Sequence, residues 1–164
     1  MGHISEKARV GIKAVVPDTA IIHDDVVVED GAILHDYVVL YPGTVIRKGA
    51  EVYDHCVVGK LPTSPGSTAR AYGPEYGQTI VGEDSILCPG VILYTGTVIG
   101  HNTLLGDYCS IRERCTVGDY CIISRNILCN QCACPYYGVL PDHHPWPQAC
   151  TSSDCHIVFN HRTA

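Results

Sequence analysis

His101 is the side chain in this sequence that best suits acid–base chemistry, because it stands in a Gly-His-Asn turn at the start of a sequence repeat. An imidazole changes charge near neutral pH, so a positioned histidine can take a proton from an attacking amine or hydroxyl. The carboxylates of Asp107 and Glu113 follow it, and we expect one of them to orient the ring, as carboxylates do for catalytic imidazoles. The alternatives are a solvated turn for His101 and, for Glu113, a solvated charged face or a salt bridge between subunits.

A second group of candidates lies in the segment 59–78 (GKLPTSPGSTARAYGPEYGQ), which is rich in Gly, Pro, Ser and Thr and interrupts the repeat. Loops longer than about 12 to 15 residues inside a compact repeat are usually functional or disordered. The segment carries basic and tyrosine side chains, which can bind a phosphate or carboxylate and stack on a flat group. These candidate substrate-binding residues are Lys60, Arg70, Tyr72 and Tyr76. A tolerated insertion without function is the alternative.

The C-terminal stretch 129–164 holds five Cys, four His and four Pro, and the repeat stops there. Three interpretations stay open. It is an irregular or disordered extension, because proline blocks β hydrogen bonds; or it binds zinc; or it is translated out of frame. The zinc ligands would come from Cys129, Cys132, Cys134, Cys150, Cys155 and His156.

The elements that position these residues follow from a strict six-residue spacing of aliphatic side chains, with a small or β-branched residue two places before each. A period of six fits neither a helix nor a hairpin, but it suits a solenoid whose flat faces each take one repeat. Three repeats make one coil, so about three coils lie on each side of segment 59–78. The aliphatic positions are Val10, Val16, Ile22, Val28, Leu34, Leu40, Ile46, Val52, Val58, Val81, Leu87, Leu93, Ile99, Leu105, Ile111, Val117 and Ile123.

One other position of the repeat predicts corners with unusual backbone angles, because glycines recur there. Its occupants in the first coils are Asp25, Gly31, Tyr37, Gly43, Gly49 and His55.

The repeats VPDTAI, VEDGAI, LYPGTV, VGEDSI, IGHNTL and VGDYCI resemble the hexapeptide pattern of the left-handed β-helix superfamily. The stretch GDYCSIRERCTVGDYCIISRN is similar to the bacterial sugar-modifying acetyltransferases of that superfamily. The resemblance covers residues 10–128. It implies an all-β, left-handed parallel β-helix of about six coils with one extruded loop and an irregular tail. It also implies homotrimers with parallel axes and active sites in the clefts between subunits.

The same resemblance implies a function. We expect an acyl-CoA-dependent acyltransferase, with acetyl-CoA or another acyl-CoA as co-substrate, that modifies an amine or hydroxyl of a sugar or nucleotide sugar. A cleft histidine is the usual base in such enzymes, which favours His101. The alternatives are a metalloenzyme like the γ-class carbonic anhydrases and a non-catalytic or truncated structural trimer. The metal pattern of those anhydrases reads GHxxxxH, whereas Gly106 stands five residues after His101, so we expect no metal in the helical body.

Composition limits the classes of binding partner and the cellular compartment that we expect. The net charge of −6 without a basic cluster argues against nucleic acid and anionic membranes. No stretch approaches the roughly 20 apolar residues that span a membrane, and no signal peptide is visible, so we expect a cytoplasmic protein. Thiols at inward positions are expected to be reduced; they are Cys56, Cys109, Cys115 and Cys121.

The expected organisation is a lead-in or cap over residues 1–9, a β-helix over 10–128 and the tail over 129–164.

Overall fold

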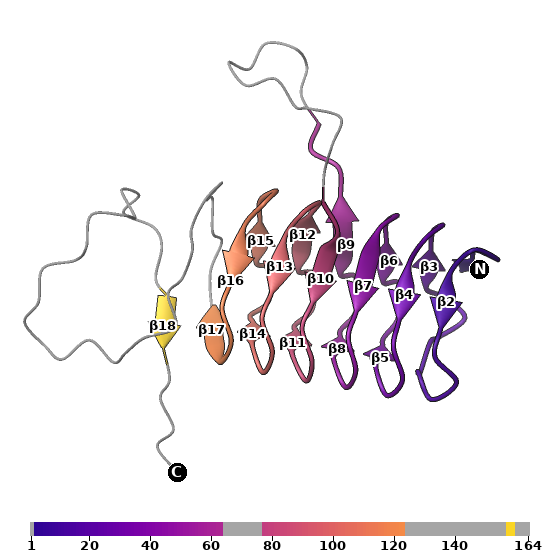
Figure 1. Ribbon diagram of the computed structural model, residues 1–164, viewed down its shortest axis with the longest axis horizontal. Coiled ribbons are helices and arrows are strands. Elements are labelled where there is room, and N and C mark those ends of the chain that lie inside the picture. Colours follow the sequence, from indigo (N-terminus) through magenta and orange to yellow (C-terminus); the bar gives the residue numbers. More distant parts are fainter. Residues whose placement is uncertain (1, 64–76, 124–156, 160–164) are drawn as a thin grey trace, which may run out of the picture.

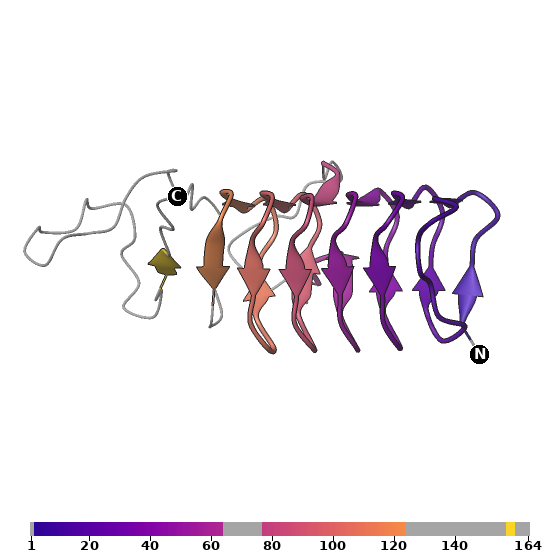
Figure 2. The same ribbon diagram turned by 90° about the horizontal axis from the view of Figure 1, so that it is seen from below.

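The computed structural model describes residues 2–63, 77–123 and 157–159, which form strands and turns without any helix. The strands stack into a solenoid with three flat faces that winds in the left-handed sense from the N-terminal end (Figure 1). Seen from below, its rungs lie side by side along one axis (Figure 2). The fold implied by the resemblance to the hexapeptide superfamily, an all-β left-handed parallel β-helix, is confirmed.

Each face is a six-stranded sheet made of two- to four-residue strands. Sheet A contains β1 (His3–Ile4), β3 (Ile21–Ile22), β6 (Val39–Leu40), β9 (Val57–Lys60), β12 (Ile92–Tyr94) and β15 (Ser110–Ile111). Sheet B contains β2 (Arg9–Val10), β4 (Val27–Val28), β7 (Thr44–Ile46), β10 (Thr79–Val81), β13 (Val98–Ile99) and β16 (Thr116–Val117). Sheet C contains β5 (Ile33–Leu34), β8 (Glu51–Val52), β11 (Ile86–Leu87), β14 (Leu104–Leu105), β17 (Cys121–Ile123) and β18 (Ile157–Phe159).

The strand register shows that one coil takes three hexapeptides. Val27 pairs with Val45 and Ile86 with Leu104, in parallel, so residues 18 apart stack on one another. Across segment 59–78 the sheet continues without a gap, because Thr79 pairs with Thr44. Gly59 and Lys60 still belong to β9, so the chain leaves the solenoid after Lys60 and returns at Thr79, close to the break in the repeat. Residues 64–76 lie outside the described residues.

The interior of the solenoid is the aliphatic grid read from the sequence. Each two-residue strand turns its second residue inward, and the grid residues from Ile22 to Ile123 are buried. Val16 is only partly buried, and Val10 keeps 38% of its surface exposed. These two belong to the first coil, which has no earlier coil beneath it.

The corners adopt the backbone angles predicted for them. All six predicted corner residues have positive φ, from 56° at Asp25 to 78° at Gly31. The same position continues after the loop, where Asn102 (φ 50°) and Tyr120 (φ 55°) take it. The side chain just before each of these residues, which includes His101, is therefore carried on a tight left-handed corner.

Strands at both ends of the solenoid come from the expected lead-in and the expected tail. Within the lead-in, β1 pairs in parallel with β3 and lies at the end of sheet A. Within the tail, β18 pairs with β17 in the antiparallel direction, unlike the other strand pairs of the described residues. The remaining predictions for 129–164 lie outside the described residues. No helix in the described part of the chain is long and apolar enough to cross a membrane.

Candidate active site

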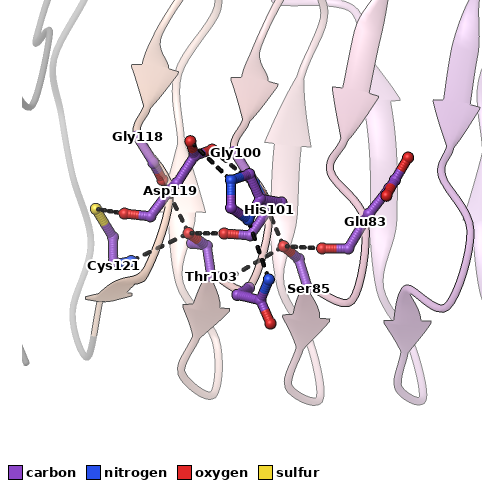
Figure 3. A network of polar contacts seen from close by, with 9 residues as sticks. Glu83, Ser85, Gly100, His101, Thr103, Gly118, Asp119 and Cys121 are labelled. Atoms are coloured by element: carbon purple, nitrogen blue, oxygen red, sulfur yellow. Dashed lines mark hydrogen bonds and ion pairs between the residues drawn. The ribbon is translucent and has the colours of Figure 1, made fainter. Parts of the chain in front are cut away.

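His101 stands at the corner between β13 and β14, where the chain turns from sheet B to sheet C. One coil later the same corner carries Asp119, because residues 18 apart stack. The imidazole Nε2 lies 3.0 Å from Asp119 Oδ2 (Figure 3). The two side chains form an imidazole–carboxylate pair. The pair is partly exposed to solvent, with 43% of the His101 side chain and 35% of the Asp119 side chain accessible.

The structure places Asp119, not Asp107 or Glu113, beside the His101 ring. Six residues advance the chain by one face, so Asp107 lies at the corner between β14 and β15 and Glu113 at the corner between β15 and β16. The three residues therefore occupy three different corners. Glu113 is buried and has Oε2 3.0 Å from the Nε atom of Arg112. The signal that would have found Asp119 is the coil length of 18 residues rather than the repeat length of six.

Asp119 holds His101 through both carboxylate oxygens. Its Oδ1 accepts a hydrogen bond from the backbone N–H of His101 at 2.9 Å, while Oδ2 faces the ring. The approach is close enough that a Cβ on Gly100 would collide with Asp119 Oδ1. Glycine before the histidine is thus required for the pair, and Gly82 keeps the same space free one coil earlier, beneath the carbonyl of Gly100.

The two polar neighbours of the ring, Asp119 and Asn102, favour one tautomer of His101. An ionised carboxylate has no proton to donate, so a neutral ring avoids two facing lone pairs when its proton is on Nε2, which lies 3.0 Å from Asp119 Oδ2. The other nitrogen, Nδ1, then has the lone pair. The amide nitrogen Nδ2 of Asn102 lies 3.0 Å from Nδ1 and donates to it. Tyr120 adds an edge-on contact with its ring centroid 4.8 Å from that of the imidazole.

A ladder of buried hydroxyl groups fixes the turns that carry the pair (Figure 3). Ser85 Oγ donates to the carbonyl of Gly100 at 2.7 Å and accepts from the backbone N–H of Thr103 at 2.9 Å. Thr103 Oγ1 repeats this pattern one coil on: it donates to the carbonyl of Gly118 at 2.8 Å and accepts from the N–H of Cys121 at 3.1 Å. Each hydroxyl therefore satisfies two backbone groups of the next corner, which holds His101 and Asp119 in register.

The predicted substrate-binding residues fall elsewhere. Lys60 ends β9 at the corner where the chain enters sheet B, whereas His101 lies at the corner where it leaves that sheet. The Nζ atom of Lys60 lies 5.7 Å from the centre of the Tyr94 ring, and Arg112 covers the same ring at 4.2 Å. A register shift between β9 and β12 pairs Tyr94 with Lys60 in place of Gly59. The remaining predicted residues, Arg70, Tyr72 and Tyr76, lie outside the described residues.

A second imidazole–carboxylate pair, which sequence reasoning did not find, lies between sheets C and A. His35 Nε2 is 2.8 Å from Glu51 Oε1, and its ring stacks on Tyr53 with centroids 4.4 Å apart. The hydrogen bond to Glu51 raises the pKa of the Tyr53 hydroxyl. This pair is about as exposed as the first, with 34% of the His35 side chain accessible. Face-to-face stacking on Tyr53 ties two coils together, which gives His35 a structural role.

The described residues bring together no three His, Cys, Asp or Glu side chains that could hold a metal ion. Four of the five cysteines in this part of the chain are buried. Burial raises the pKa of the Cys56 thiol to about 12, so this thiol stays protonated at neutral pH and is a poor nucleophile. The candidate chemistry of the described residues therefore rests on the exposed imidazole of His101.

Fold and site together define a class: a left-handed parallel β-helix of hexapeptide repeats with a histidine–aspartate pair at one corner. The family model "Bacterial transferase hexapeptide (six repeats)" matches residues 96–126, a range that includes both members of the pair. No curated protein matches the chain. The resemblance to the hexapeptide superfamily stated from the sequence is confirmed by this match and by the fold.

Solved structures of the same fold include PerB from Caulobacter crescentus in complex with CoA and GDP-perosamine, with a TM-score of 0.59, 18% identity and 75% of this chain covered. The alignment spans 50% of PerB. Two weaker likenesses are a mutant of AntD, an N-acyltransferase from Bacillus cereus (TM-score 0.46, 15% identity, 74% of each chain), and the acetyltransferase domain of PglB from Neisseria gonorrhoeae (TM-score 0.38, 16% identity, 76% of this chain and 54% of that one).

Proposed function

We propose that the protein transfers an acyl group, most simply acetyl, from acyl-CoA to an amine or hydroxyl of a sugar or nucleotide sugar. The observation that carries the proposal is the exposed His101–Asp119 pair on a hexapeptide β-helix. PerB, which shares the fold, was solved with CoA and a nucleotide sugar. That complex supports both substrates as candidates for this chain.

In the proposed reaction Nδ1 of His101 is the base. The acceptor nitrogen or oxygen bonds to the thioester carbonyl carbon while Nδ1 takes its proton. The carbon–sulfur bond then breaks, and the imidazolium returns the proton to the departing thiolate. Asp119 holds Nε2–H and stabilises the positive ring in between. A positioned imidazole base typically contributes about 10² to 10⁴ in rate.

The charges at this corner favour an amine as the acceptor. Asp119 lies against the ring, and Glu83 and Asp84 occupy the same corner one coil earlier. Figure 3 shows the Glu83 carboxylate pointing away from the ring, so it contributes negative potential without pairing with His101. A sugar amine is largely an ammonium ion at neutral pH, and such a cation is attracted to a surface of this sign. The bound ammonium first loses one proton to water, and the neutral amine then attacks while Nδ1 takes the second proton.

We further propose that the working unit is a homotrimer. Most strands turn an aliphatic residue outward as well as inward, which is typical of sheets covered on both faces. The outward aliphatic residues are Ile21, Val27, Ile33, Val39, Val45, Val57, Ile80, Ile86, Ile92, Val98, Leu104 and Ile122. Lys60 and His101 lie at different corners of one chain, so a neighbouring copy is the simplest way to bring a basic residue of the loop to a histidine. Sedimentation equilibrium tests this.

The experiment for the activity compares His101→Ala with His35→Ala. Both histidines pair with a carboxylate at similar exposure, so general effects of losing such a pair appear in both. Thiol release from acetyl-CoA is measured against a panel of amino and hydroxy sugars and their nucleotide derivatives. We expect His101→Ala to lose about 10² to 10⁴ in turnover and His35→Ala to keep it. No turnover by the wild type with any acceptor, or unchanged turnover in His101→Ala, overturns the proposal.

A further inference from the structure

An open groove of about 650 Å³ lies on the outer surface of sheet B near the N-terminal end of the solenoid, apart from the groups that carry the proposed reaction. Residues of β2 and β4 line it, together with residues of the corner where the chain turns from sheet B to sheet C. The lining includes Arg9, Val10, Val27, Glu29, Asp30 and Lys48. Aliphatic walls with a few charged groups are typical of small-molecule sites.

Two cationic side chains of the groove form no ion pair with any residue that the structure describes. One is Arg9, which occupies the outward position of β2, where Val27 stands one coil later. The other is Lys48, which donates its backbone N–H to Glu29 Oε2 at 3.0 Å and leaves its ammonium group exposed. Both cations are therefore available to a ligand.

The carboxylates of the groove are already engaged. Glu29 Oε1 lies 2.6 Å from a guanidinium nitrogen of Arg47, and its other oxygen accepts the N–H of Lys48. Asp30 Oδ1 accepts the backbone N–H of Lys13 at 3.2 Å. With Arg47 included, three cationic groups stand against two carboxylates, so this part of an otherwise acidic chain attracts anions.

The backbone places Lys48 on the same corner as His101. The N–H of Asp84 donates to the carbonyl of Lys48 at 3.1 Å, and the N–H of Asn102 donates to the carbonyl of Glu83 at 2.8 Å. These hydrogen bonds stack Lys48, Glu83 and His101 in three consecutive coils, along an unbroken sheet B (Figure 1). Adjacent strands are about 4.8 Å apart, so the backbone of Lys48 lies roughly 10 Å from that of His101.

The corner therefore presents opposite charges at the two ends of this distance. Asp119 and Glu83 lie in the coils on either side of His101, whereas Lys48 and Arg9 follow toward the N-terminal end. An amino sugar linked to a nucleoside diphosphate has the matching order of charges, with a cationic amine on the sugar ring and anionic phosphates at its anomeric end. Complementary charges of this kind also determine which way round a ligand lies.

We propose that the groove is the nucleotide site of the acceptor: Arg9 and Lys48 bind the diphosphate, and Val10 and Val27 pack against the nucleoside. Arginine and lysine are the usual partners of phosphate oxygens, arginine through parallel N–H donors. The proposal rests on the proposed function for the role of the sugar, whereas binding of the nucleotide stands on the groove alone. It makes the acceptor a nucleotide-linked amino sugar and not a free sugar.

Isothermal titration calorimetry with GDP, UDP and dTDP tests the site without catalysis. We expect at least one nucleotide to bind, and Arg9→Ala and Lys48→Ala each to raise its Kd about fivefold to thirtyfold, because each variant loses one charge-assisted contact with phosphate. Lys48→Glu should raise the Kd further, since a carboxylate repels the phosphate. Lys7→Ala is the matched control: Lys7 also belongs to the first coil but pairs with Asp24 at another corner, so the Kd should stay that of the wild type.

Inorganic phosphate and pyrophosphate distinguish a nucleotide site from a simple anion site. Both should bind about tenfold or more weakly than the best nucleotide, because they bury no apolar surface against Val10 and Val27. Equal Kd values for pyrophosphate and the nucleotide overturn the proposal. It is also overturned if no nucleotide binds, or if the Arg9 and Lys48 variants bind as the wild type does.

Kinetics then connects the groove with the reaction. Lys48→Ala should raise the KM of a nucleotide-linked amino sugar about fivefold to thirtyfold with kcat nearly kept, and should leave the KM of the free amino sugar unchanged. An equal rise for both substrates contradicts a nucleotide contact. A wild type that binds the nucleotide through Arg9 and Lys48 but transfers no acyl group ends the proposed function and leaves the nucleotide site standing.

Discussion

His101 and Asp119 lie at the same corner of consecutive coils, with Nε2 of the imidazole 3.0 Å from Oδ2 of the carboxylate. The carboxylate also accepts the backbone N–H of His101, so the pair depends on the stacking of the two coils. A variant that disturbs the stacking of these two coils should therefore also lower the activity.

Replacing Asp119 by Asn should cut turnover by about 10² or more while leaving the fold intact. An amide at this position no longer fixes the proton on Nε2 and cannot stabilise the imidazolium. Asp107→Asn is the matched control, since Asp107 lies at another corner. Steady-state kinetics with the best acceptor measure both. A larger loss in Asp107→Asn than in Asp119→Asn would return the orienting role to Asp107.

Thr103→Val should destabilise the protein by about 1 to 3 kcal/mol, because an isosteric change leaves the Gly118 carbonyl and the Cys121 N–H buried without their partner. Thr116, whose side chain is exposed on β16, supplies the control Thr116→Val. Urea unfolding followed by circular dichroism gives the free energy of unfolding. Equal stability of the two variants would show that the hydroxyl ladder is not needed to hold the coils.

A carboxylate in the aliphatic interior should unfold the solenoid. Leu34 and Ile99 are 2% and 1% exposed, and an unpaired buried charge costs several kcal/mol against a typical total stability of about 5 to 15 kcal/mol. Leu34→Asp and Ile99→Asp are compared with Ile12→Asp, a fully exposed position. Circular dichroism melting should show a native-like curve only for the Ile12 variant.

The Cys56 thiol should make stability fall at high pH. Burial raises its pKa from 9.0 to about 12 in the folded protein. Between those values the unfolded chain loses the proton and the folded chain keeps it, so the free energy of unfolding decreases as pH rises through this range. Cys56→Ala should show a shallower decrease over the same range in urea titrations. An identical slope in both proteins would mean that the thiol ionises normally in the fold.

Much of this architecture could be predicted from the sequence because the repeat is local and regular. The six-residue spacing determines which residues face inward, and Leu34 and Ile99 are buried as it requires. The recurrence of glycine likewise marks the left-handed corners, including those at Tyr37 and His55 where no glycine stands. The extruded segment is visible as a break in the same spacing.

The contacts of the functional side chains became definite only in the tertiary structure. The choice of Asp119 over Asp107 depends on which residues share a corner, and that follows from three faces making one coil. The contact of Lys60 with Tyr94 depends on a register shift at Gly59, and the repeat pattern does not predict this shift. A hexapeptide pattern specifies inside and outside because burial is a property of single positions. Which side chains meet across neighbouring coils depends on how the coils stack, so these contacts are set only in the folded chain.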